Sequence, residues 1–144
     1  MNLLFVIDDA YVEQFKVVLF SIAHQMPQQD FQVYVMQKIL LEKDAEIGHF
    51  VEKLGMVYHP IVVGDEAFAH PPTTDLYPDT IYNRLLAHEF LSAEVDKILY
   101  LDADLICLND FRELYEVELG NQLYAAASHN EDGRLLDYVN KLRL

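Results

Sequence analysis

The stretch Lys-Ile-Leu-Tyr-Leu-Asp-Ala-Asp, residues 97–104, decides how the rest of the chain is interpreted. Its first five residues form a short, strongly apolar run that ends directly at Asp102. An apolar run of this length, bounded by charge, is typical of a strand that is buried on both faces of a parallel sheet. In open α/β sheets, ligands bind beyond the carboxyl ends of the strands. The stretch therefore predicts both a fold class and the position of a site.

The two aspartates of this stretch predict a cation site. Residues two apart in an extended chain point the same way, so we expect Asp102 and Asp104 to project together, with Ala103 turned back. Two neighbouring carboxylates repel each other and favour a cation between them. Their oxygen atoms suit Mg²⁺ or Mn²⁺, and either ion neutralises a diphosphate.

Two other interpretations of the acidic pair stay open. In the simplest, Asp102 and Asp104 end a strand and solvate the loop that follows. In the other, the pair belongs to a phosphatase with an aspartyl nucleophile. Phosphatases of that kind carry the pair on their first strand, whereas here it follows the fourth predicted strand, so we rank this alternative lower.

The rest of the chain alternates strands and helices. This order predicts an α/β protein with a mostly parallel sheet, flanked by helices and joined by right-handed crossovers. Periodicity and capping signals predict strands over 3–7, 31–36, 56–63 and 97–101, with one more over 124–128, helices over 11–26, 41–54 and 79–91, and a loop over 64–78.

Further candidate residues are expected at the same edge of the sheet. Asp8 and Asp9 end the first strand, and Tyr11 follows closely, so the acids and the ring can hold a nucleotide base. The alternative interpretation is that one of the aspartates caps the next helix and that Tyr11 packs on the first turn of that helix. Arg84 lies on the helix that precedes residues 97–104. A helical arginine is usually solvated, but this one can be presented to phosphate or sugar hydroxyl groups.

Composition narrows the class of protein. The chain has 144 residues and a net charge of −14, which suits one domain and argues against nucleic acid as a partner. No apolar run is long enough to cross a bilayer. Cys107 is the single cysteine, so an intrachain disulfide is impossible, and a cytoplasmic setting is expected. Glycine-rich phosphate loops are absent, which disfavours nicotinamide dehydrogenases and P-loop kinases.

Three segments together resemble glycosyltransferase family 8, which includes bacterial lipopolysaccharide galactosyl- and glucosyltransferases and glycogenin. They are residues 5–11 (Phe-Val-Ile-Asp-Asp-Ala-Tyr), 82–85 (Tyr-Asn-Arg-Leu) and 97–105 (Lys-Ile-Leu-Tyr-Leu-Asp-Ala-Asp-Leu). The likeness covers nearly the whole chain, and the segment around Asp102 is its most specific part. The resemblance implies a Rossmann-like GT-A fold and a retaining transfer of a hexose from a UDP-sugar, dependent on Mn²⁺ or Mg²⁺, to a glycan, lipid-linked or protein acceptor.

The resemblance also implies a role for each candidate residue. Asp102 and Asp104 would bind the metal, and Asp102 and Arg84 would be the catalytic residues. The donor nucleotide sugar would be bound by Asp8, Asp9, Tyr11, Arg84, Asp102 and Ala103. Asp8 would hold the edge of the uracil, and Tyr11 would stack on its ring. Ala10 departs from the family, where a polar residue often stands at this position.

A larger departure is the length of the chain. Domains of this family are usually much longer, and their later part supplies a third metal ligand, a histidine, and most of the acceptor pocket. We therefore expect residues 1–144 to be the donor part of a truncated domain, with the acceptor part absent. Such a chain would bind metal and donor weakly, transfer little sugar, and self-associate through core surface left exposed. The alternatives are a non-catalytic nucleotide-binding or assembly module and, less favoured, a metal-dependent phosphohydrolase.

Overall fold

The computed structural model describes residues 1–64 and 84–126, and these form a parallel sheet with helices on both faces. The strands are β1 (Asn2–Val6), β2 (Gln32–Gln37), β3 (Val57–Val62) and β4 (Leu99–Tyr100). All pairings are parallel, and the spatial order is β3-β2-β1-β4. The chain builds the sheet outward from β1 to β3 and then returns to the other side of β1. The strand order therefore reverses between β1 and β4, which is where open α/β sheets bind their ligands.

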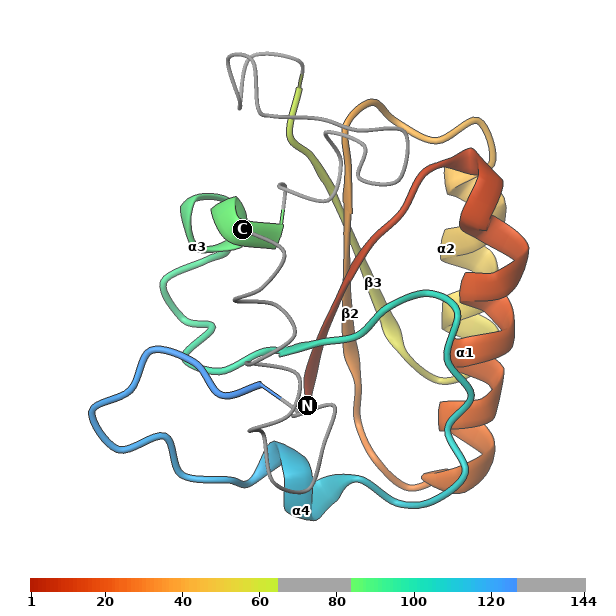
Figure 1. Ribbon diagram of the computed structural model, residues 1–144. Helices are drawn as coiled ribbons and strands as arrows, with labels where there is room; N and C mark the ends of the chain where they lie inside the picture. The colour runs from red at the N-terminus through yellow and green to blue at the C-terminus, as the bar shows by residue number, and fades with distance from the viewer. Residues whose placement is uncertain (65–83, 127–144) are drawn as a thin grey trace, which may run out of the picture.

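Helices cover the two faces of the sheet unequally (Figure 1). Two long helices, α1 (Val12–Gln25) and α2 (Asp44–Lys53), lie side by side on one face. The short helix α3 (Ala87–Phe90) lies on the other face, and α4 (Arg112–Tyr115) lies beyond β4 in the sequence. None of the helices in the described ranges is long and apolar enough to cross a membrane.

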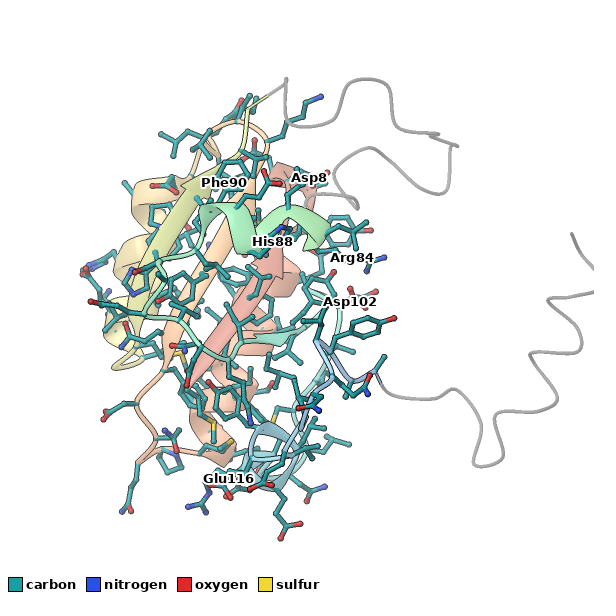
Figure 2. All side chains as sticks on the ribbon, turned by 90° about the vertical axis from the view of Figure 1, so that its left-hand side faces the viewer. Asp8, Arg84, His88, Phe90, Asp102 and Glu116 are labelled. Atoms are coloured by element: carbon teal, nitrogen blue, oxygen red, sulfur yellow. The ribbon has the colours of Figure 1, made fainter. Side chains whose placement is uncertain are left out.

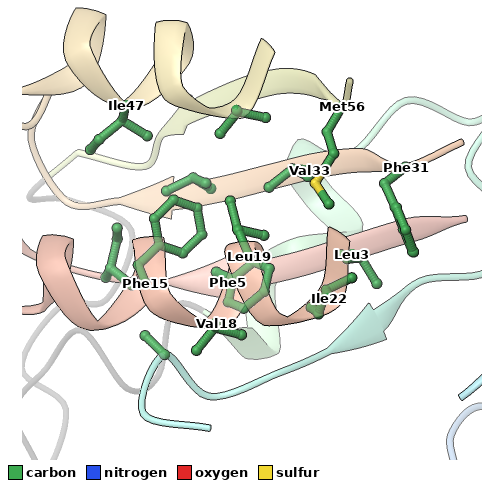
Figure 3. Close-up of a cluster of buried hydrophobic side chains, with 14 of the residues drawn as sticks. Leu3, Phe5, Phe15, Val18, Leu19, Ile22, Phe31, Val33, Ile47 and Met56 are labelled. Carbon is green, nitrogen blue, oxygen red and sulfur yellow. The ribbon is translucent and has the colours of Figure 1, made fainter. Parts of the chain in front are cut away.

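Alternation along β1 supplies apolar side chains to both faces. Leu3 and Phe5 are fully buried in the main core against α1 and α2, whereas Leu4 packs on the opposite face with Met36 and Ala87. Figure 3 shows the main core, in which the rings of Phe5 and Phe15 meet edge to face with centroids 5.0 Å apart. Each such buried side chain stabilises the fold by about 1.5–3 kcal/mol.

The first helix begins later than the periodicity predicted. Residues 9–11 form a 3-10 turn, and α1 starts at Val12. Asp8 caps the 3-10 turn, because its Oδ1 accepts a hydrogen bond of 2.9 Å from the backbone N–H of Ala10. Capping by Asp8 is thus confirmed, although the turn rather than α1 receives it. The expected end near Pro27 is confirmed, since α1 ends at Gln25.

The second helix is also shorter than predicted. It was expected over 41–54, but α2 begins at Asp44, and the N–H of Leu41 in the preceding turn donates to Oε1 of the buried Gln37 at 2.7 Å. Gly55 ends the helix in the left-handed region, with φ of 77°. That conformation favours glycine and fits the expected C-cap.

The remaining elements differ more from the prediction. Of the helix expected over 79–91, residues 84–86 form a 3-10 turn, 87–90 form α3, and 79–83 lie outside the described residues. The ladder of β4 covers only 99–100, and α4 was not predicted. No strand forms over 124–126, where Tyr124 is 81% exposed, and the rest of that prediction lies outside the described residues, as does the predicted loop after Gly64.

Candidate functional site at the carboxyl ends of β1 and β4

The parallel register brings the predicted site residues to neighbouring strand ends. Leu4 pairs with Tyr100, and the N–H of Leu101 donates to the carbonyl of Leu4 at 3.0 Å. Asp102 therefore leaves the sheet beside the end of β1, close to the point where Asp8 leaves it. Figure 2 shows Asp8, Arg84 and Asp102 following one another along the same side of the molecule.

The side chains of the turn at 102–104 point as predicted, with Ala103 inward and the two aspartates outward. Ala103 is only 8% exposed and belongs to the main core, whereas Asp102 and Asp104 are exposed. Burying the small side chain between them anchors the turn to the sheet. Both carboxylates thus lie at the surface beside the end of β4.

Tyr100 links two of the candidate residues. Its hydroxyl donates a 2.7 Å hydrogen bond to Oδ1 of Asp102, and the guanidinium carbon of Arg84 lies 5.4 Å from the centre of its ring. Burial, together with donation to Asp102, raises the pKa of Tyr100 to about 12 against the opposing effect of Arg84. The hydroxyl therefore stays protonated near neutral pH and donates to the carboxylate.

Tyr100 is a site residue that was not predicted from the sequence, because the apolar run around it indicated only a strand. The alternation that placed Asp104 on the side of Asp102 also places Tyr100 there, since the three residues are spaced two apart. That spacing was the signal that could have found it.

The acids after β1 take part in backbone contacts. Asp8 caps the 3-10 turn, as described above, and Oδ1 of Asp9 accepts a 3.0 Å hydrogen bond from the N–H of Glu42. Asp9 thus joins the loop after β1 to the loop before α2. Tyr11 is 46% exposed, so its ring is accessible to a ligand. The structure shows the capping role of Asp8, and contact of these residues with a base stays a prediction.

The acidic pair supplies only part of the ligand set of a metal ion. Among residues 1–64 and 84–126, no group of three or more His, Cys, Asp or Glu side chains is arranged to hold a metal ion. Asp102 and Asp104 supply two exposed carboxylates, and a Tyr100 hydroxyl already contacts one oxygen of Asp102. Mg²⁺ and similar ions commonly accept one or two carboxylates and complete their shell with water and substrate phosphates. The residues present fit that kind of site.

A separate hollow lies at the opposite end of the sheet and has a different character. It is lined by residues 23, 26–31 and 54–56, with Asp30 the sole ionisable side chain among them. Its lining offers neither paired carboxylates nor a cation. The acidic edge at β1 and β4 is therefore the better candidate site, although it is an exposed edge rather than a cavity.

The family model and the relatives that match this chain agree on one family. A model of glycosyl transferase family 8 matches residues 2–143. A lipopolysaccharide 1,2-glucosyltransferase of Escherichia coli is 28% identical over 120 residues, which are 81% of this chain and 34% of that protein. A second protein of the same description, from strain K12, is 33% identical over 60 residues, 42% of this chain and 18% of its own.

Solved structures show the same fold. The galactosyltransferase LgtC, in complex with donor and acceptor sugar analogs, superposes with a TM-score of 0.78 at 22% identity, over 100% of this chain and 52% of LgtC. The glycosyltransferase GlyE of Streptococcus pneumoniae TIGR4 gives 0.64 at 24% identity, over 92% of this chain and 30% of GlyE. The expected GT-A fold is confirmed. The chain spans about a third of the length of the first curated relative, 34%, and about half of LgtC, 52%.

Proposed function

Because the chain belongs to glycosyltransferase family 8, we propose that residues 1–144 form the donor part of a retaining hexosyltransferase that uses a UDP-sugar and a divalent cation. The observation that carries this proposal is the arrangement of Arg84, Tyr100 and Asp102 at the point where the strand order reverses. Sites at such points commonly bind nucleotides.

In this proposal the acidic pair binds the cation. Asp102 and Asp104 hold Mn²⁺ or Mg²⁺ through their exposed oxygens, and the ion supplies the positive charge that stabilises a departing diphosphate. Arg84 directs its guanidinium to the same diphosphate or to the sugar beside it. Its exposed position next to Asp102 supports that role, because a chain with a net charge of −14 needs local positive charge to bind an anion.

The nucleotide base is assigned to the end of β1. Asp8 accepts hydrogen bonds from the uracil edge, Tyr11 stacks on the ring, and Asp9 fixes the loop that carries them through its contact with Glu42. Ala103 brings the turn against the core, so that the donor approaches the backbone of that turn closely. The exposure of Tyr11 supports the stacking role.

The acceptor is a glycan, a lipid-linked saccharide or a protein. The relatives called lipopolysaccharide 1,2-glucosyltransferase are consistent with the first two classes. Transfer by residues 1–144 alone is expected to be weak, because the described residues supply the donor side and no further metal ligand. A cytoplasmic setting is part of the proposal, and the partly buried free thiol of Cys107 is compatible with it.

Calorimetric titration of UDP, with and without Mn²⁺, tests this proposal. We expect binding that requires Mn²⁺ and is lost in the double variant Asp102→Asn/Asp104→Asn. The matched control is Glu94→Gln/Asp96→Asn, which removes the same charge from exposed residues before β4 and should bind as the wild type does. Equal binding by the wild type and the Asp102/Asp104 variant, or no binding by the wild type, would contradict the proposal.

A further inference from the structure

We propose that Tyr100 is a positioning residue that holds Asp102 and Arg84 in the arrangement needed to bind a cation and a diphosphate together. The inference rests on the proposed function, and it adds a residue to which neither the sequence analysis nor the comparisons give a role. Tyr100 is the described side chain that contacts both Asp102 and Arg84.

Tyr100 itself is held in place by the sheet. Its backbone pairs with Leu4 in the β1–β4 ladder. Its half-buried side chain packs on the second face of the sheet, in the cluster built around Leu4, Met36 and Ala87. A residue whose backbone and side chain are both held in place loses little further conformational entropy when it orients a neighbour.

The hydroxyl of Tyr100 orients Asp102. This aspartate is exposed just beyond the end of β4, where a carboxylate would otherwise rotate freely. The hydrogen bond from the Tyr100 hydroxyl fixes Oδ1 and thereby fixes the direction of the second oxygen. Hydrogen-bonded partners of this kind orient metal ligands, and losing one commonly weakens metal binding by about 10–100-fold.

Arg84 is restrained by the ring of Tyr100. It comes from the 3-10 turn before α3, a segment separate from the strand that carries Tyr100. Its guanidinium lies over the face of the Tyr100 ring, an arrangement that attracts a cation to the aromatic ring. The ring thus restrains the positive group while the hydroxyl restrains the acidic one. The variant Tyr100→Phe removes the hydroxyl and keeps the ring, whereas Tyr100→Leu removes both.

Titration of Mn²⁺, followed by the loss of the free-ion electron paramagnetic resonance signal, tests the contact with Asp102. Tyr100→Phe keeps the ring and removes the hydroxyl, so we expect Mn²⁺ affinity to fall by about tenfold or more. Tyr58→Phe is the matched control, because Tyr58 donates an equally short bond of 2.7 Å to Asp44 away from the site. That variant should bind Mn²⁺ as the wild type does.

Titration of UDP at saturating Mn²⁺ tests the contact with Arg84. Tyr100→Phe keeps the ring under Arg84, so it should bind UDP more tightly than Tyr100→Leu does. Tyr100→Leu removes the ring as well and should bind UDP several-fold more weakly. Thermal unfolding of each variant shows whether it is folded, and Tyr100→Phe, which keeps every carbon atom, carries the test if Tyr100→Leu does not fold.

The outcomes separate this inference from the function on which it rests. If Asp102→Asn weakens Mn²⁺ binding and Tyr100→Phe does not, the inference is wrong and the metal site stands. If Asp102→Asn also leaves Mn²⁺ binding unchanged, both are wrong. A loss of Mn²⁺ affinity in Tyr58→Phe equal to that in Tyr100→Phe would also overturn the inference, since the effect would then be general.

Discussion

At the scale of single residues, Arg84 supplies positive charge to an otherwise acidic edge. Asp8, Asp102 and Asp104 lie at or near this edge and are exposed. A diphosphate cannot approach them unless their charge is offset, either by a cation between the carboxylates or by a neighbouring guanidinium. Arg84 stays close to Asp102 through the ring of Tyr100 rather than through an ion pair. Its side chain is exposed and can contact a ligand.

We expect Arg84→Gln to weaken Mn²⁺-dependent UDP binding by about tenfold, the effect of losing one charge-assisted hydrogen bond. Arg84→Lys keeps the charge without the planar guanidinium, so its affinity for UDP should lie between those of the wild type and Arg84→Gln. Calorimetry measures the binding. The unfolding midpoint should hardly change, because the side chain is exposed. Wild-type affinity in Arg84→Gln would show that this residue does not contact the nucleotide.

Some features of the individual site residues could be predicted from the sequence, and others could not. The inward turn of Ala103 followed from alternation alone and is confirmed by its burial. The contact between Arg84 and Tyr100 could not be predicted, because it depends on where α3 crosses the second face of the sheet. The hydrogen bonds that Asp8 and Asp9 accept from the backbone were only partly foreseen, since Glu42, whose N–H donates to Asp9, is distant in sequence.

At the scale of elements, one polar network joins α2 to the neighbouring strands. Gln37, at the end of β2, donates to Oδ1 of Asp44 at 3.1 Å, and the hydroxyl of Tyr58 on β3 donates to the same oxygen at 2.7 Å. Burial raises the pKa of Tyr58 above its usual range, and the bond to Asp44 adds to the effect. The start of α2 is therefore fixed by side chains from two strands.

We expect Tyr58→Phe to lower the free energy of unfolding by about 1 kcal/mol near neutral pH, the typical net value of one hydrogen bond. Because the pKa of Tyr58 is higher in the folded chain, the unfolded chain loses this proton first as pH rises above about 10. The stabilisation is thus complete below that pH and declines above it. Urea unfolding of the wild type and Tyr58→Phe, at neutral pH and at a pH above about 10, measures the difference between their free energies of unfolding. That difference should be smaller at the higher pH, and an equal difference at the two would contradict this account.

The same network explains why element boundaries were predicted less well than element types. The helical pattern extends back to Leu41, but that residue lies in the turn before α2, where its N–H donates to Gln37 and its carbonyl accepts from the N–H of Asp44 at 3.1 Å. Such a contact between strand and loop leaves no periodic signal in the sequence. Similarly, the apolar run over 97–101 predicted β4, yet only 99–100 complete the ladder.

At the scale of the whole molecule, β1 is the centre of the fold. It pairs with both β2 and β4, and its alternating side chains enter the packing on both faces. The order of strands and helices in the sequence predicted this parallel α/β arrangement, because a helix between two neighbouring strands returns the chain so that the second strand runs parallel to the first. The comparison structures, with TM-scores of 0.78 and 0.64, confirm the fold class.

We expect Phe5→Ala to lower the free energy of unfolding by about 3–5 kcal/mol, because the ring is fully buried between β1 and α1. Phe20→Ala is the control. Its ring is 60% exposed, so the change should be within about 0.5 kcal/mol. Chemical denaturation measures both. Similar losses in the two variants would contradict the placement of the core between the sheet and the two long helices.

The central claim is that a divalent cation binds where β1 and β4 end. Paramagnetic broadening of backbone amide signals by Mn²⁺, in an NMR titration of the 144-residue chain, tests this claim most directly. The account predicts that the signals of residues 101–105 and 8–11 broaden first, and that those around Asp30, at the opposite end of the sheet, persist. Early broadening at the exposed acids Glu13 and Glu46 on the outer helices instead, with residues 101–105 unaffected, would contradict the assignment of the site.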